Sequence, residues 1–206
     1  MTFRKLVLAL ALLSMALPVA AAPRDAAAVF RDGLNAYFMG AMDEAAGFFT
    51  QAVGLQGNNA TYHYYLGRTH ERLSRPERAL EEYKAVLRID PAHIPARVAL
   101  GNLYFDRNAT ELAIEQYKTL IERSPDYQQA YYRLGILYLN SNRFAEAEQQ
   151  LIKAATMEPE DPSPHYYLGR THIRQERLLD AINRLTEAIR LSPGVGEYYY
   201  WRANAH

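Results

Sequence analysis

The octapeptide HYYLGRTH stands at residues His63–His70 and recurs unchanged at residues His165–His172. The two copies lie 102 residues apart, which is three times 34. A fixed interval of roughly 20 to 50 residues is the sequence signature of repeat architectures. The duplication therefore indicates either two copies of a histidine site or the visible part of a 34-residue framework.

A glycine marks the framework at five positions, each 34 residues after the last: Gly33, Gly67, Gly101, Gly135 and Gly169. An alanine follows each glycine by 12 residues: Ala45, Ala79, Ala113, Ala147 and Ala181. A large apolar side chain follows each alanine by four residues: Phe49, Tyr83, Tyr117, Leu151 and Leu185. Proline then ends four of the five units, at Pro91, Pro125, Pro159 and Pro193. The period therefore runs through most of the chain.

This pattern resembles the tetratricopeptide repeat, in which W-x2-L-G-x2-Y is followed by A-x3-F and then by P at a period of about 34. The resemblance covers residues 26–195 as five gapless units, 26–59, 60–93, 94–127, 128–161 and 162–195, and a terminal helix over 196–206 follows. Asp32 departs from the leucine of the pattern, and the tryptophan position holds Val29, His63, Arg97, Tyr131 and His165. The resemblance implies an all-α fold, a right-handed α-solenoid of helix–turn–helix repeats.

Each unit has the pattern of two amphipathic helices joined by a short turn, for example Ala60–Leu73 followed by Glu77–Ile89. Glycine and alanine allow close packing, because a larger side chain would push the axes apart from their spacing of about 8–10 Å. The turns are predicted at Gly40, Ser74, Asn108 and Ser141–Asn142. Since one unit cannot bury its apolar face alone, stacked neighbours must supply the core. The segment GEYYYWRANAH, residues 196–206, is expected to stack on the fifth unit as the first helix of a sixth.

The first residues have the layout of a secretory signal peptide. Arg4 and Lys5 precede an apolar run, Leu6–Leu17, and small residues follow it. Such a segment is removed from the mature protein. We expect cleavage after Ala21, with Val19 and Ala21 as the small recognition residues, and a periplasmic or secreted protein. The alternative is an uncleaved anchor, but the run of 12 residues is shorter than the roughly 20 that a spanning helix needs.

Charge and cysteine content exclude some classes of function. The chain has 23 basic and 23 acidic side chains, and removal of Arg4 and Lys5 with the signal peptide leaves a net charge of −2. Nucleic-acid binders usually carry a basic patch or stripe, so no nucleic-acid partner is predicted. The chain has no cysteine, so packing alone must stabilise an exported domain and no thiol is available for a lipid anchor.

The repeated histidines do not have the spacing of a metal site. His63 and His70 are seven residues apart, about 10.5 Å along a helix, and one ion with ligand bonds of about 2 Å cannot bind both. We interpret them, with His165 and His172, as packing residues of the framework. The chain has no G-x-S-x-G, H-E-x-x-H or phosphate-binding glycine loop. Neither an enzyme nor a cofactor is predicted.

The resemblance implies that the first helices of the units line a concave groove. Its candidate binding residues are rich in tyrosine and arginine, two residue types that are enriched at binding hot spots. They are Tyr64, Tyr65, Arg68, Arg72, Asn102, Tyr132, Arg133, Tyr166, Tyr167, Arg170, Arg174 and Tyr200. Arg68 and Arg170 are expected to face solvent. Glu81 and Glu148 are expected to be outer charges that take no part in binding.

Together these features predict an exported scaffold or adaptor that binds an extended peptide or a partner protein, in envelope assembly, secretion or pilus-type machinery. Two alternatives stay open. The chain is a homo-oligomeric structural element that self-associates through its C-terminal helix, or it is the repeat-bearing part of a longer enzyme. No stable membrane insertion is expected once the signal peptide is cleaved.

Overall fold

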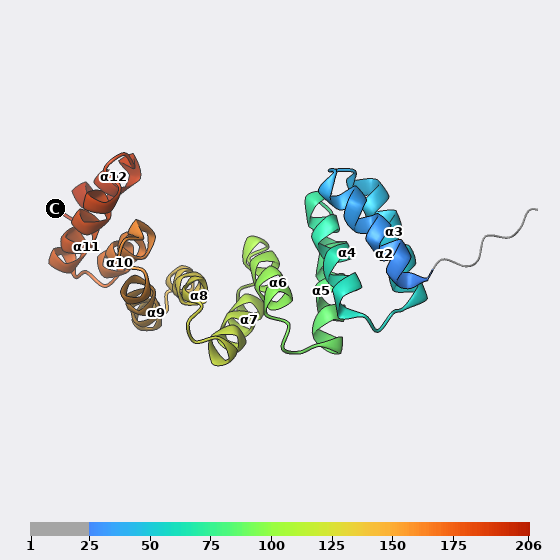
Figure 1. The fold of residues 1–206 in the computed structure, drawn as a ribbon. Helices are drawn as coiled ribbons and strands as arrows, with labels where there is room; N and C mark the ends of the chain where they lie inside the picture. The colour runs from blue at the N-terminus through green and yellow to red at the C-terminus, as the bar shows by residue number, and fades with distance from the viewer. Residues whose placement is uncertain (1–24) are drawn as a thin grey trace, which may run out of the picture. The chain divides into compact units, whose positions relative to one another are not determined.

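The computed structural model describes residues 25–206, which form eleven α-helices and contain no β-strand. The predicted signal peptide over residues 1–21 and its cleavage after Ala21 lie outside these residues. The described chain divides into two compact parts, the first ending at Gly57 and the second beginning at Asn58. From here on these two parts are called units, and the 34-residue segments are called repeats. Figure 1 shows the helices of both units, coloured from blue to red along the chain.

The first unit contains the helix pair α2 (Ala26–Phe38) and α3 (Met42–Leu55). The Asp25 side chain begins α2, because its carboxylate accepts a hydrogen bond of 2.6 Å from the Ala28 amide. Val29 of α2 and Phe49 of α3 are fully buried between the two helices. A Cβ atom at Gly33 would lie 2.6 Å from the Phe49 ring, so glycine is required there for the helices to approach.

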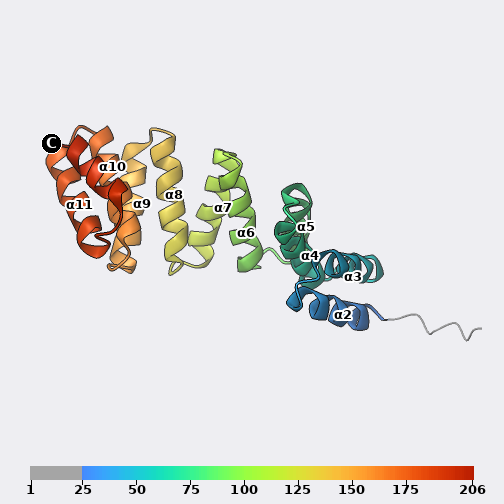
Figure 2. The same ribbon diagram turned by 90° about the horizontal axis from the view of Figure 1, so that it is seen from above.

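The second unit stacks nine helices in chain order, each packed against the next: α4 (Ala60–Arg72), α5 (Pro76–Ile89), α6 (Ile94–Asp106), α7 (Thr110–Arg123), α8 (Gln128–Asn140), α9 (Phe144–Met157), α10 (Pro162–Arg174), α11 (Leu178–Leu191) and α12 (Gly196–Asn204). Figure 2 shows α6, α7, α8 and α9 following one another along this unit. The predicted fold class, an α-solenoid of helix–turn–helix repeats, is confirmed.

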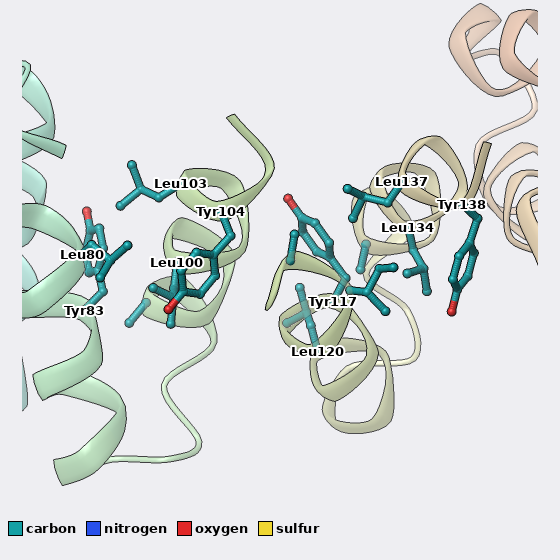
Figure 3. Packing of buried hydrophobic residues seen from close by; sticks show 14 of the residues in the cluster. Leu80, Tyr83, Leu100, Leu103, Tyr104, Tyr117, Leu120, Leu134, Leu137 and Tyr138 are labelled. Atoms are coloured by element: carbon teal, nitrogen blue, oxygen red, sulfur yellow. The ribbon is translucent and has the colours of Figure 1, made fainter. Parts of the chain in front are cut away.

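The core of the second unit is continuous across repeats. Figure 3 shows Leu80 and Tyr83 of α5, the leucines of α6 and α8, and Tyr117 of α7 as layers of one cluster. The framework alanines are fully buried, as their role in close packing requires. The side chain that meets each framework glycine is the large apolar one 16 residues later: a Cβ at Gly169 would lie 2.5 Å from Leu185 Cγ. Each glycine therefore makes room for that side chain.

The turns between paired helices share one backbone conformation at 34-residue intervals. Positive φ angles of 54° to 84° occur at Gly40, Ser74, Asn108, Asn142 and Glu176. The Arg75 amide donates a 2.8 Å hydrogen bond to the carbonyl of His70, and the Arg177 amide donates one of 2.9 Å to His172, so each turn closes the end of the first helix. The first four turns were predicted. Glu176 was missed, because glutamate is not a typical turn residue.

The terminal helix α12 packs against both α10 and α11, as predicted for the first helix of a sixth repeat. Tyr198 is buried against Tyr166, Leu185 and Ile189. Tyr200 is 62% exposed and Tyr199 is 41% exposed. One side of α12 therefore completes the core of the fifth repeat, while another side presents aromatic side chains to solvent.

Candidate peptide-binding surface

A cavity of about 420 Å³ lies between α4 and α6 in the second unit. It is lined by Tyr64, Arg68, Glu71, Ile94, Pro95, Val98, Ala99, Asn102 and Tyr127. The volume falls within the roughly 300–1,000 Å³ of pockets that hold small ligands or single side chains. Tyr64, Arg68 and Asn102 were predicted binding residues, and the structure brings them together here.

Local hydrogen bonds set the positions of the two helices that form the cavity. Asn59 caps the N-terminus of α4, because its side-chain oxygen accepts hydrogen bonds from the Thr61 amide at 3.0 Å and the Tyr62 amide at 3.4 Å. His93 begins α6 in the same way, with Nδ1 accepting a 3.1 Å bond from the Ala96 amide. The His93 ring also lies 4.9 Å from the Tyr64 ring. The contact with His93 helps to hold Tyr64 on the wall of the cavity.

Two buried tyrosines hold the polar side chains of the cavity. The Tyr83 hydroxyl donates a hydrogen bond to the Glu71 carboxylate, and the Tyr117 hydroxyl donates one of 2.8 Å to the Asn102 side-chain oxygen. Burial raises the pKa of both phenols, and for Tyr83 the bond to Glu71 raises the pKa further. Both hydroxyls therefore stay protonated and act as donors. The Asn102 amide nitrogen is thus directed away from Tyr117 and can donate to a ligand carbonyl.

A second cluster of aromatic and arginine side chains joins α8, α10 and α12. The rings of Tyr132 and Tyr167 are 5.6 Å apart. The guanidinium carbon of Arg170 lies 5.5 Å from the Tyr166 ring, 5.4 Å from the Tyr167 ring and 4.8 Å from the Trp201 ring. Burial, with the Tyr167 phenol as the next cause, raises the pKa of Tyr132 to about 12. Arg170 is only partly exposed, because Trp201 of the following helix lies against it, whereas it had been expected to face solvent.

The sequence profile of the tetratricopeptide repeat matches residues 30–94, 98–164 and 166–206. The chain belongs to the tetratricopeptide repeat family. A comparison with curated proteins gave no match.

Solved structures of other tetratricopeptide repeat proteins have the same fold. YrrB, a TPR protein with an unusual peptide-binding site, superposes with a TM-score of 0.79 at 19% identity, over 85% of this chain and 91% of YrrB. MamA from Desulfovibrio magneticus RS-1 gives a TM-score of 0.76 at 22% identity, over 82% of this chain and 97% of MamA. A thermophilic TPR protein of Thermus thermophilus gives 0.56 at 21% identity, over 87% of this chain and 98% of that protein. At these identities the likeness concerns the fold.

The other predicted binding residues of this tetratricopeptide repeat protein lie outside the cavity. Arg174, at the end of α10, donates a 2.5 Å hydrogen bond to the Asn142 side chain and lies over the Phe144 ring. Its side chain therefore packs against the turn between α8 and α9. Arg133 lies 4.8 Å from the ring of Phe105. Tyr65 is half-buried beside Tyr64, with the two rings 5.8 Å apart. Arg72 is exposed at the end of α4, and Tyr200 is exposed on α12.

Sequence reasoning missed several residues that form the cavity. Ile94, Pro95 and Ala99 supply its α6 wall, and Glu71 and Tyr127 complete it. Val98 lies one helical turn before Asn102 on α6 and also lines the cavity. Glu71 follows Arg68 by three residues and so lies on the same side of α4, which is the one signal that could have identified it.

The histidines of the two octapeptides lie in different surroundings. His63 Nδ1 is 2.6 Å from the Glu82 carboxylate, whereas its counterpart His165 is buried and its Nδ1 has no hydrogen-bond partner in residues 25–206. His70 and His172 are buried within the repeat framework. Across the described helices, no group of three or more histidine and acidic side chains is placed to hold a metal ion. The same helices include none long and apolar enough to cross a membrane.

The expectation that Glu148 is a solvated outer charge was wrong. Its side chain is 20% exposed and accepts hydrogen bonds from Arg177 at 2.8 Å, Gln175 at 3.2 Å and His172 at 3.2 Å. Burial acts to raise the pKa of Glu148, but these bonds outweigh it and lower the pKa. Glu148 therefore joins α9 to α10 and to the turn before α11. Glu81 is exposed and pairs with Lys84 at 3.1 Å, as expected of an outer charge.

Proposed function

We propose that this protein is an exported, non-enzymatic scaffold that binds an extended peptide segment of a partner protein on the first helices of the second unit. Tetratricopeptide repeats are typically protein-interaction modules, which supports a protein or peptide ligand. The export half of the proposal rests on Arg4, Lys5 and the apolar run that follows them. An envelope role in assembly, secretion or pilus-type machinery would follow from that location.

The α4–α6 cavity is the observation that supports peptide binding best. Its walls combine apolar side chains, such as Ile94 and Val98, with three polar ones, Arg68, Glu71 and Asn102. An apolar pocket with a few convergent polar groups is the usual form of a binding site. The apolar wall suits a bulky anchor side chain of the ligand. The Arg68 guanidinium suits a carboxylate, and the Asn102 amide suits a backbone carbonyl.

The test is a pair of charge reversals against an identified partner. The purified chain is immobilised, partners are captured from an envelope extract and identified by mass spectrometry, and binding is then measured by calorimetry. Arg68→Glu should raise the Kd more than tenfold, about 1.4 kcal/mol, because a carboxylate would repel an acidic ligand. Arg68 is exposed, so the helical content should not change.

The matched control is Glu81→Lys, which reverses an exposed charge on the second helix of the same repeat. Its Kd should equal that of the parent. If Arg68→Glu also binds like the parent, the interface lies elsewhere on the molecule and the proposed groove function fails.

Self-association through α12 is the second candidate function. The exposed rings of Tyr199 and Tyr200 favour it, because exposed aromatic side chains that lie together often mark an interface. Light scattering on the purified chain tests it. A monomer at all concentrations excludes this alternative, whereas a dimer that Tyr200→Ser disrupts would favour it over a groove ligand.

A further inference from the structure

From α6 onward, one position on each first helix of the second unit faces the first helix before it. This bridging position lies two residues before the framework glycine or its equivalent and is occupied by Ala99, Arg133, Tyr167 and Trp201. Arg133 of α8 reaches the Phe105 ring of α6 at 4.8 Å. Tyr167 of α10 lies 5.6 Å from Tyr132 of α8, and Trp201 of α12 lies 4.8 Å from Arg170 of α10. Each large side chain therefore contacts the first helix before it.

Ala99 is the one small residue at the bridging position of the second unit. Its side chain ends at Cβ and cannot reach α4. The unfilled space is the cavity of about 420 Å³, which has Ala99 on one wall and Tyr64 and Arg68 on the other. The cavity therefore lies beside the one bridging position that has no large side chain, whereas the next three repeats place a large side chain against the preceding first helix.

The second octapeptide shows what the first one can bind. Tyr64 and Arg68 have the same sequence context as Tyr166 and Arg170, and in both pairs arginine Nη1 donates to the tyrosine hydroxyl at 3.3 Å. In the second copy the indole of Trp201 lies on the guanidinium. We propose that the α4–α6 cavity binds an aromatic side chain of the partner, placed on Arg68 as Trp201 is placed on Arg170. This inference rests on the proposed peptide-binding function and specifies its anchor residue.

The walls of the cavity favour an aromatic ring over an aliphatic side chain. A ring can lie on the face of the Arg68 guanidinium while the in-plane N–H groups keep their other hydrogen bonds. The rings of Tyr64 and Tyr127 supply further aromatic contacts. Glu71 stands where the second copy has Ile173, so this cavity also contains an acceptor. An indole N–H or a phenol O–H can donate to it, so tryptophan and tyrosine are the preferred anchors.

Small-molecule probes test this inference without the natural partner. The isotopically labelled full chain is titrated with N-acetyl-L-tryptophanamide and, separately, with N-acetyl-L-leucinamide, and amide chemical shifts are followed. The tryptophan probe should shift resonances of residues 64–71 and 94–102 and should bind at least about threefold more tightly than the leucine probe. Probe shifts confined to other parts of the chain, or equal affinities for the two probes, would overturn the proposal.

Filling the cavity from within is the decisive variant. Ala99→Trp restores a large bridging side chain and should abolish the shifts on α4 and α6. Ala145→Trp adds the same side chain at an exposed position of α9 and should leave them unchanged. Far-UV circular dichroism checks that both variants keep the helical fold. An Ala99→Trp chain that folds and binds like the parent would exclude the cavity as the site.

Arg68→Met gives a second measurement that leaves the α6 wall of the cavity unchanged, and Arg68 is exposed, so the fold should be kept. It keeps an unbranched side chain and removes the guanidinium. The tryptophan probe should bind about two- to fivefold more weakly and the leucine probe should be unaffected. An equal loss for both probes would reject stacking on Arg68.

The two proposals fail separately. A captured partner whose affinity is unchanged by Ala99→Trp leaves the scaffold function standing and refutes the aromatic anchor. A tryptophan probe that binds in the cavity, with no protein captured through the groove, supports the aromatic site and refutes the scaffold function.

Discussion

Glu176 adopts a backbone conformation in its turn that costs free energy and that glycine would adopt without strain. Glu176 has a φ of 59°, in the left-handed region, where a side chain other than glycine costs about 1–2 kcal/mol. Glycine avoids this cost but loses more entropy on folding, about 0.5–1 kcal/mol. Glu176→Gly should therefore raise the free energy of unfolding by about 0.5–1 kcal/mol, measured by urea denaturation.

Asn108→Gly is the control for that substitution, because asparagine tolerates the left-handed region better than glutamate does. Its gain in stability should be smaller than that of Glu176→Gly. Equal gains would mean that the strain at Glu176 is relieved by its surroundings, and a loss at Glu176 would mean that its side chain stabilises the turn.

Two buried histidines should make stability depend on pH. Burial lowers the pKa of His70 below its ordinary 6.5, and Arg78 and Arg75 lower it further. Burial and then Arg184 lower the pKa of His165. The unfolded chain therefore binds protons more readily than the folded one below about pH 6.5, so the stabilisation is complete above that pH and is lost as the pH falls toward the folded-state pKa.

The expected result is a free energy of unfolding that is lower at pH 5.5 than at pH 7.5, measured by urea denaturation with both pH values buffered at equal ionic strength. The double variant His70→Gln/His165→Gln should show a smaller difference between the two pH values. His206→Gln changes an exposed histidine at the last residue and is the control. A double variant with the parent's pH dependence would assign that dependence to other groups.

At the scale of the element, α12 stabilises the end of the second unit. Tyr198 and Ala205 are buried, the Tyr166 hydroxyl donates to Glu197, and Trp201 covers Arg170. Removal of residues after Gly194 would expose the apolar surface of α10 and α11. At about 1.5–3 kcal/mol for each large side chain that is buried, removal of Tyr198 alone should lower the free energy of unfolding of the truncated chain by about 1.5–3 kcal/mol. Urea denaturation of both chains measures this difference, and equal stability would show that α12 contributes only a tail.

The helix pairs were predictable from the sequence because the framework residues of a pair contact one another within a single repeat. The glycine, the large apolar residue 16 positions later and the left-handed turn all belong to one helix–turn–helix, so their spacing alone predicts it. The cavity was not predictable in this way. The cavity depends on Ala99 of one repeat facing Arg68 of the repeat before it, and on the side-chain rotamers around the space between them.

The two octapeptides show the same limit at the level of the site. Identical sequences predicted identical roles for Arg68 and Arg170, yet Arg68 lines an open cavity and Arg170 lies under an indole. The difference comes from the next helix along the chain, which offers Ala99 in one case and Trp201 in the other. Glu148 was misjudged for the same reason, since its partners His172, Gln175 and Arg177 belong to the following repeat.

At the scale of the whole molecule, the proposed function depends on where the chain is located. Export is proposed from Arg4, Lys5, the run Leu6–Leu17 and the small residues Val19 and Ala21. Signal peptidases recognise small side chains before the cleaved bond, and proline directly after the bond fits such a site poorly. Cleavage should therefore follow Ala21 and not Ala22. Mass spectrometry of the protein from a periplasmic fraction should show a mature chain that begins at Ala22. Ala21→Tyr should block cleavage and leave a chain that retains residues 1–21. An intact Met1 on parent protein from the cytoplasm would reject export, and the groove ligand would then have to be sought among cytoplasmic proteins.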